Sequence, residues 1–95
     1  MKAKTQVLLF ITEEDLENAR RAKTLRAGLE RAGWSCRVVN RLSNDLDELR
    51  LAARYRAVHV PRWVIEVSGK VWRDELVMPS FNEASRVLAK LETTK

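Results

Sequence analysis

The sequence predicts an α/β domain in which a mixed four-stranded sheet forms in the order β-α-β-α-β-β-α. A continuous apolar run, Val7 to Ile11, is typical of a strand covered on both faces. An amphipathic stretch follows it and leads to a second strand, which makes a parallel, right-handed βαβ unit. A Ser68-Gly69 turn joins the last two strands into a hairpin, and a final helix follows.

Length and composition favour one globular domain over residues 1–95. The chain has 95 residues, of which 45% are hydrophobic and 33% are charged, which is ordinary for a compact domain. The run Val7 to Ile11 is too short for a bilayer, which needs about 20 apolar residues. The first six residues lack the apolar region of a signal peptide. We therefore expect a soluble cytoplasmic protein that does not bind a membrane.

The charge balance argues weakly for an acidic partner. Eighteen Lys and Arg against thirteen Asp and Glu give a net charge of +5. Acids and bases cancel within residues 13–32, 43–56 and 57–79, so the excess is scattered over Lys2, Lys4, Arg37, Arg41 and Lys95. Nucleic-acid binders usually cluster their bases on one face, and we therefore do not favour a nucleic acid as the partner.

The first helix is expected over about residues 13 to 32. Thr12 would cap it, with Asp15 completing a capping box, and Gly33 would end it. We interpret the neighbouring acids as complements of the helix dipole rather than as catalytic carboxylates. Gly28 suggests close packing on a strand. The expected buried stripe is Leu16, Ala19, Ala22, Leu25, Leu29 and Ala32.

The remaining elements follow from the same patterns. Residues 34–40 predict a strand with one half-polar face, as at a sheet edge. A short helix begins at Ser43-Asn44-Asp45, ends near Tyr55, and is expected to turn Leu46, Leu49 and Ala53 inward. One strand enters after Pro61, another runs from Lys70 to Met78, and Ser80 with Glu83 caps the last helix. Its expected buried stripe is Phe81, Ala84, Val87, Leu88 and Leu91.

This order of elements, together with short motifs, resembles the thioredoxins and glutaredoxins. In those families a helix ends in Lys-Tyr, Val-x-x-Val-Pro-Thr leads into a strand, and a glycine turn and final helix follow. The matching segments here are Val7 to Phe10, Asn18 to Lys23, Leu51 to Pro61, Val64-Ile65, Gly69-Lys70-Val71 and Pro79-Ser80. The resemblance implies a thioredoxin-like three-layer sandwich over nearly the whole chain.

The cysteines of those families are missing from this sequence. They carry Cys-x-x-Cys or one cysteine at the start of the first helix, where the corresponding residues here are about Leu16 to Ala19. Cys36, the only cysteine, falls on the second strand, where we expect it to pack as a small apolar side chain. One cysteine also excludes an internal disulfide and a cysteine-based zinc cage.

Residues 59 to 62 carry the sharpest hypothesis. The resemblance implies a cis Val60-Pro61 bond and a backbone that pairs with a bound peptide or with glutathione; the alternative is that Pro61 only sets the entry into a strand. Arg62 stands in place of the family's usual threonine and is able to grip a carboxylate. His59, the only histidine, is either a loop residue without a role or a polar contact.

The three tryptophans are expected mainly in the core, although the hairpin position of Trp63 and Trp72 leaves room for one at the surface.

These observations lead to three hypotheses of function. The first is a non-catalytic thioredoxin-like module that binds a protein or peptide and uses no cofactor or metal. The second is a glutathione-dependent or thiol oxidoreductase that uses Cys36 or a partner's thiol, and the third is nucleic-acid binding. For the first, the expected contact residues are Thr12, Glu13, Asp15, His59, Val60, Pro61 and Arg62.

Overall fold

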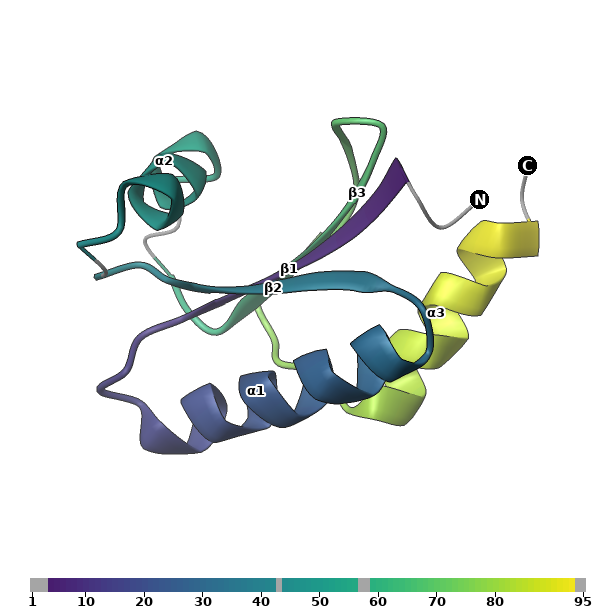
Figure 1. Cartoon of the computed structure of the whole chain (residues 1–95), viewed down its shortest axis with the longest axis horizontal. Coiled ribbons are helices and arrows are strands. Elements are labelled where there is room, and N and C mark those ends of the chain that lie inside the picture. Colours follow the sequence, from purple (N-terminus) through teal and green to yellow (C-terminus); the bar gives the residue numbers. More distant parts are fainter. Residues whose placement is uncertain (1–3, 43, 57–58, 94–95) are drawn as a thin grey trace.

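The computed structural model describes residues 4–42, 44–56 and 59–93, and it has the predicted order of elements. No helix in these ranges is long and apolar enough to cross a membrane. The elements are β1 (Thr5–Ile11), α1 (Leu16–Arg31), β2 (Ser35–Asn40), α2 (Leu46–Arg54), β3 (Arg62–Val67), β4 (Lys70–Glu75) and α3 (Phe81–Thr93) (Figure 1).

The strands form one open mixed sheet in the order β2-β1-β3-β4. β1 is parallel to β2 and antiparallel to β3, and β3 is antiparallel to β4. The position of β2 at an edge confirms the expectation from its half-polar face. The Ser68-Gly69 turn has φ values of 52° and 81°, as a two-residue type I′ hairpin turn requires.

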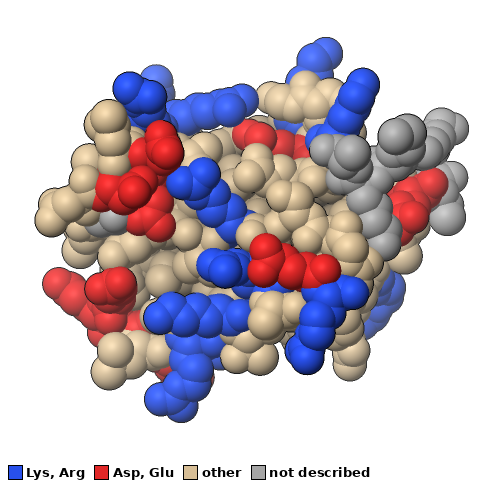
Figure 2. Space-filling view, viewed as in Figure 1, with Lys and Arg blue, Asp and Glu red and all other residues tan. Residues whose placement is uncertain are grey.

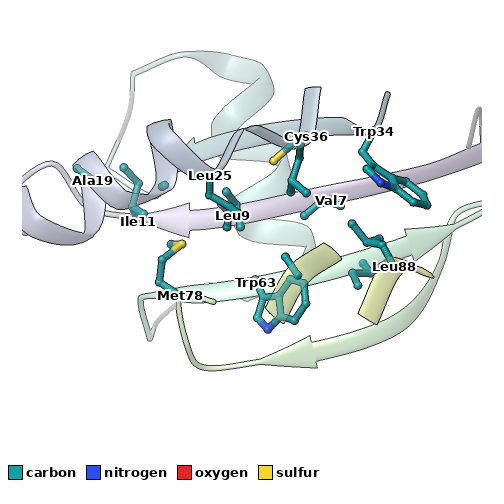
Figure 3. Packing of buried hydrophobic residues seen from close by; sticks show 14 residues of the cluster. Val7, Leu9, Ile11, Ala19, Leu25, Trp34, Cys36, Trp63, Met78 and Leu88 are labelled. Carbon is teal, nitrogen blue, oxygen red and sulfur yellow. The ribbon is translucent and has the colours of Figure 1, made fainter. Parts of the chain in front are cut away.

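Helices cover both faces of the sheet, which gives three layers (Figure 1). α1 and α3 lie against one face, where Val7, Leu9 and Ile11 of β1 are buried with Trp63 and Leu88 (Figure 3). α2 lies against the other face, where Leu8 and Phe10 belong to a second buried cluster. The alternation along β1 therefore supplies both cores. Trp34 is also buried, whereas Trp72 is 41% exposed.

Glycine ends α1 as predicted. Gly33 has a φ of 92°, and the N–H groups of Gly33 and Trp34 donate to the carbonyls of Glu30 and Leu29. These two bonds make a Schellman motif, in which the left-handed residue satisfies the last carbonyls of the helix.

The first two helices, α1 and α2, begin later along the chain than the sequence pattern predicts. α1 starts at Leu16 rather than near residue 13, because Asp15 and not Thr12 is the N-cap. α2 starts at Leu46 with Asp45 as its N-cap; Ser43 lies outside the described residues. In each case an aspartate accepts the N–H of the residue three positions later, which satisfies a donor that the helix itself leaves free.

The buried stripes differ from the predicted ones at the helix ends. In α1, Leu16 and Ala32 are exposed, and the other members of the predicted stripe are buried: Ala19, Ala22, Leu25 and Leu29. α2 turns Leu51 and Ala52 inward and leaves Leu46, Leu49 and Ala53 exposed. Phe81 of α3 is 43% exposed. β4 ends at Glu75, not at Met78.

Gly28 packs against α3 and not against a strand. A Cβ built at this position would lie 2.9 Å from Cδ1 and 3.1 Å from Cε1 of Phe81. The absence of a side chain thus allows the aromatic ring at the start of α3 to lie directly on the α1 backbone.

We expect the effect of Gly28→Ala to depend on Phe81. Alanine is favoured over glycine in a helix by about 1 kcal/mol, but in the native protein the new methyl group must displace the Phe81 ring. The substitution should therefore stabilise the Phe81→Ala variant by about 1 kcal/mol and the native protein by less. Urea unfolding of the native protein, the two single variants and the double variant measures this coupling. An equal gain in the free energy of unfolding from Gly28→Ala with and without the Phe81 ring would contradict it.

Candidate partner-binding site

Two loops with most of the expected contact residues leave the sheet at the same end. β1 and β3 are antiparallel, and Phe10 pairs with Arg62, so the end of β1 lies beside the start of β3. Residues 12–15 continue from the first and residues 59–61 lead into the second. The Val60-Pro61 peptide bond is cis. We call residues 12–16 and 59–61 together the edge surface.

The loop after β1 is held by its own backbone and by Asp15. The Asp15 N–H donates to the Thr12 carbonyl, which closes a turn. The Asp15 carboxylate accepts the backbone N–H and the side-chain amide of Asn18, at 3.2 and 2.7 Å. These bonds lower the pKa of Asp15. Its carboxylate therefore serves the start of α1, while Glu13 and Glu14 are exposed.

Leu16 is the apolar residue of this surface that the sequence analysis missed. It is the first residue of α1 and is 72% exposed. The helical spacing predicts Leu16 in the buried stripe, but in the structure the stripe begins one turn later, at Ala19. Its place directly after an N-cap aspartate is the signal that could have set it apart, because the first helical residue projects beyond the face that packs on the sheet.

Arg62 is bound within the protein rather than free for a partner. Its Nε and Nη2 atoms donate to the two carboxylate oxygens of Asp74 at 2.8 and 2.6 Å, and Nη1 donates to the Tyr55 carbonyl at 2.6 Å. The guanidinium also lies 5.9 Å from the ring centroids of Phe10 and Tyr55. The expected carboxylate grip exists, but its carboxylate is that of Asp74 on β4.

A second arginine holds α2 to the hairpin. Nη2 of Arg54 donates to the Gly69 carbonyl at 3.1 Å and lies 3.5 Å from Oε2 of Glu66. Glu66 is a buried carboxylate on β3, so the arginine offsets the cost of its burial. Arg54 and Arg62 together fix the end of α2 to the strands. The bond from Arg62 to the Tyr55 carbonyl holds the end of α2 beside the start of β3.

Cys36 lies in the core between the sheet and α1 (Figure 3). It is 7% exposed. Burial and the nearby Glu30 carboxylate raise the pKa of its thiol to about 12, against a smaller opposite effect of Arg26. A thiol in this environment stays protonated at neutral pH, and the thiolate is the nucleophile in disulfide exchange.

A polar cavity of about 220 Å³ adjoins the edge surface through Glu13. It lies beside α1 and the start of α2, and two acids and two bases line it: Glu13, Glu48, Lys23 and Arg26.

Within residues 4–42, 44–56 and 59–93, no group of three or more His, Cys, Asp or Glu side chains is arranged to hold a metal ion. His59 is exposed.

The fold is that of solved thioredoxins. Thioredoxin from Fasciola hepatica has a TM-score of 0.68 at 16% identity, over 94% of this chain and 82% of that one. Thioredoxin-2 of the malaria parasite, a component of its protein secretion machinery, has a TM-score of 0.68 at 16% identity, over 95% and 85%. A thioredoxin mutant from Halobacterium salinarum has 0.65 at 13%, over 92% and 74%.

At these identities the likeness establishes the thioredoxin-like fold alone. No protein-family model matches the sequence, and no curated protein matches it.

We expect the Cys36 thiol to react very slowly in the folded protein. With a pKa of about 12, its thiolate fraction at pH 8 is about 10⁻⁴, whereas an ordinary thiol of pKa about 8.5 is roughly one-quarter ionised. Labelling by an aromatic disulfide reagent should therefore be at least about 100-fold faster in the urea-unfolded protein. Fast labelling of the folded protein would contradict the burial of this thiol.

Asp74→Asn should lower stability at neutral pH but not in acid. The Arg62 hydrogen bonds hold the pKa of Asp74 below its usual range, so the ion pair contributes fully above the unfolded-state pKa of about 3.9. The contribution is lost as the pH falls through the folded-state pKa. We expect a loss of about 1 kcal/mol at pH 7, since the pair is partly exposed.

Urea unfolding between pH 7 and pH 2.5 tests this, with exposed Glu14→Gln as the control. A loss from Asp74→Asn that persists at the lowest pH would contradict a role of the ionised pair.

Proposed function

We propose that this thioredoxin-like domain is a binding module that captures a protein or peptide partner at its edge surface without thiol chemistry. The observation that carries the proposal is Leu16. Its side chain is 72% exposed at the start of α1, in the stretch of about Leu16 to Ala19 that corresponds to the cysteine position of the thioredoxins and glutaredoxins, and it offers an apolar contact in place of a nucleophile.

The energy of burying Leu16 is enough to matter for binding. Full burial of a leucine side chain contributes about 1.5–3 kcal/mol, and a few such residues commonly dominate the affinity of an interface. Val60 and Pro61 are half-buried at the same end of the sheet and extend the apolar area. We place the partner's apolar side chain against Leu16 and its backbone beside Val60, with His59 at the rim.

Arg62 has a supporting part in this proposal. Its donors are already engaged by Asp74 and Tyr55, so the residue positions the Val60-Pro61 segment and does not itself contact the partner. Asp15 acts similarly for the start of α1, through its bonds to Asn18. Thr12 and Glu13 remain as polar contacts around the apolar centre.

Thiol exchange by the protein itself has little support. The 95 residues contain one cysteine, and it is buried with a raised pKa on β2. Insulin-reduction and glutathione-disulfide assays should show no activity above the uncatalysed rate. Activity that disappears in Cys36→Ser would overturn the proposal and favour an oxidoreductase.

The structure offers a matched control for the binding test. Leu46 is the first residue of α2, follows the N-cap Asp45, and is 61% exposed. Leu16 stands in the same local setting in α1 but at the edge surface. Leu16→Glu and Leu46→Glu therefore make the same chemical change at equivalent helix positions.

We expect affinity capture from the native cell with Leu16→Glu to lose at least about tenfold of the partner, a change of 1.4 kcal/mol, whereas Leu46→Glu should retain it. Quantitative mass spectrometry of the captured proteins gives the ratio, and circular dichroism checks that both variants are folded. Equal losses, or capture that Leu16→Glu leaves unchanged, would reject the edge surface as the binding site.

A further inference from the structure

A second surface, away from the edge surface, is formed where α1 passes the start of α3 (Figure 1). Two cavities of about 420 and 280 Å³ adjoin there, because Thr24 and Phe81 line both of them. We call the two together the α1–α3 groove. Volumes of this size accommodate drug-sized ligands or a few side chains of a peptide.

The floor of the groove is apolar. The Phe81 ring lies against the Gly28 backbone and is 43% exposed. Leu25, Ala32 and Pro79 line the groove on either side of the ring. An exposed aromatic ring beside a helix is a suitable contact for an apolar side chain of a partner.

The rim of the groove is basic. Arg20, Arg21 and Arg31 line the two cavities, and no acid is among their described lining residues. Glu17 lies 3.9 Å from Arg21, with both side chains largely exposed, and such a pair contributes little. The polar cavity beside α2 differs, because its two bases are balanced by Glu13 and Glu48. Figure 2 shows basic side chains along the part of the surface that α1 occupies in Figure 1.

We propose that the α1–α3 groove binds an acidic peptide segment of a partner protein. An apolar side chain of the segment packs on Phe81 between α1 and α3, and flanking carboxylates pair with Arg20 and Arg31. Arginine suits this use because its planar guanidinium binds a carboxylate through two hydrogen bonds. The proposal is independent of the edge surface and would stand if that surface had no partner.

The lining favours a peptide over a nucleic acid. A nucleic-acid strand brings one phosphate per nucleotide and needs a continuous basic track with aromatic rings on which successive bases stack, whereas the described lining of this groove has one aromatic ring, Phe81, and three arginines. A peptide combines apolar and charged side chains at short spacing, which matches a floor of one aromatic ring and small residues between arginines.

The probe for the test is a fluorescein-labelled synthetic peptide, Glu-Glu-Asp-Leu-Phe-Glu-Asp-Glu, followed by fluorescence anisotropy. We expect saturable binding that weakens with added salt. The double variant Arg20→Glu/Arg31→Glu should raise the Kd at least tenfold, and Phe81→Ala should raise it several-fold. A peptide with Ser-Ser in place of Leu-Phe should bind more weakly than the parent, and one with lysines in place of the acids should not bind.

The control Arg50→Glu/Lys70→Glu makes the same change in net charge at exposed residues of α2 and β4 and should leave the Kd within twofold. If the charge reversal unfolds the protein, as circular dichroism would show, Arg20→Gln/Arg31→Gln replaces it, with an expected loss of affinity of at least threefold.

No saturable binding of the peptide, or an equal loss of affinity in the control, would overturn the proposal. A single-stranded oligothymidine of equal charge that binds more tightly and is lost through the same arginines would identify the groove as a nucleic-acid site instead.

Discussion

The burial of β1 on both faces is the constraint on which the rest of the structure depends. Its residues Val7 to Ile11 are at most 2% exposed, and alternate side chains enter the two cores. A strand of this kind must lie inside a sheet with helices on both sides. Because β1 also pairs with β3 in the opposite direction, its carboxyl end and the start of β3 lie together. The edge surface is therefore a consequence of how β1 is buried.

Much of this architecture could be predicted from local patterns, since the apolar run, the Gly33 end of α1 and the Ser68-Gly69 turn each specify backbone geometry over a few residues. The orientation of α2 could not. Its sequence has apolar residues on more than one side, and the contacts that hold it are polar and distant in sequence, from Arg54 to the hairpin turn and from Arg62 to the Tyr55 carbonyl. No periodicity of apolar residues encodes such contacts.

Contacts between residues distant in sequence also limit how much of the candidate site the sequence predicts. The loops at the end of the sheet followed from the order of elements, but which side chains are free in them did not. Arg62 pairs with Asp74, twelve positions away, and this pairing exists only because β3 and β4 are adjacent and in register. The sequence pattern predicts Leu16 in the core because helical spacing shows which residues share a face but not where the packed part of that face ends.

The distribution of charge in three dimensions adds specificity that the net charge of +5 conceals. Some acids lie at the end of the molecule where α1 and α2 begin, others are scattered over the rest of this face, and bases lie along α1 (Figure 2). By these proposals, an acidic peptide would be repelled by Glu13 and Glu14 at the edge surface and attracted by the arginines of the α1–α3 groove. A partner of the edge surface must instead be apolar, with neutral or basic flanks. If both proposals hold, the two surfaces select different chemistry, and one partner segment cannot substitute for the other.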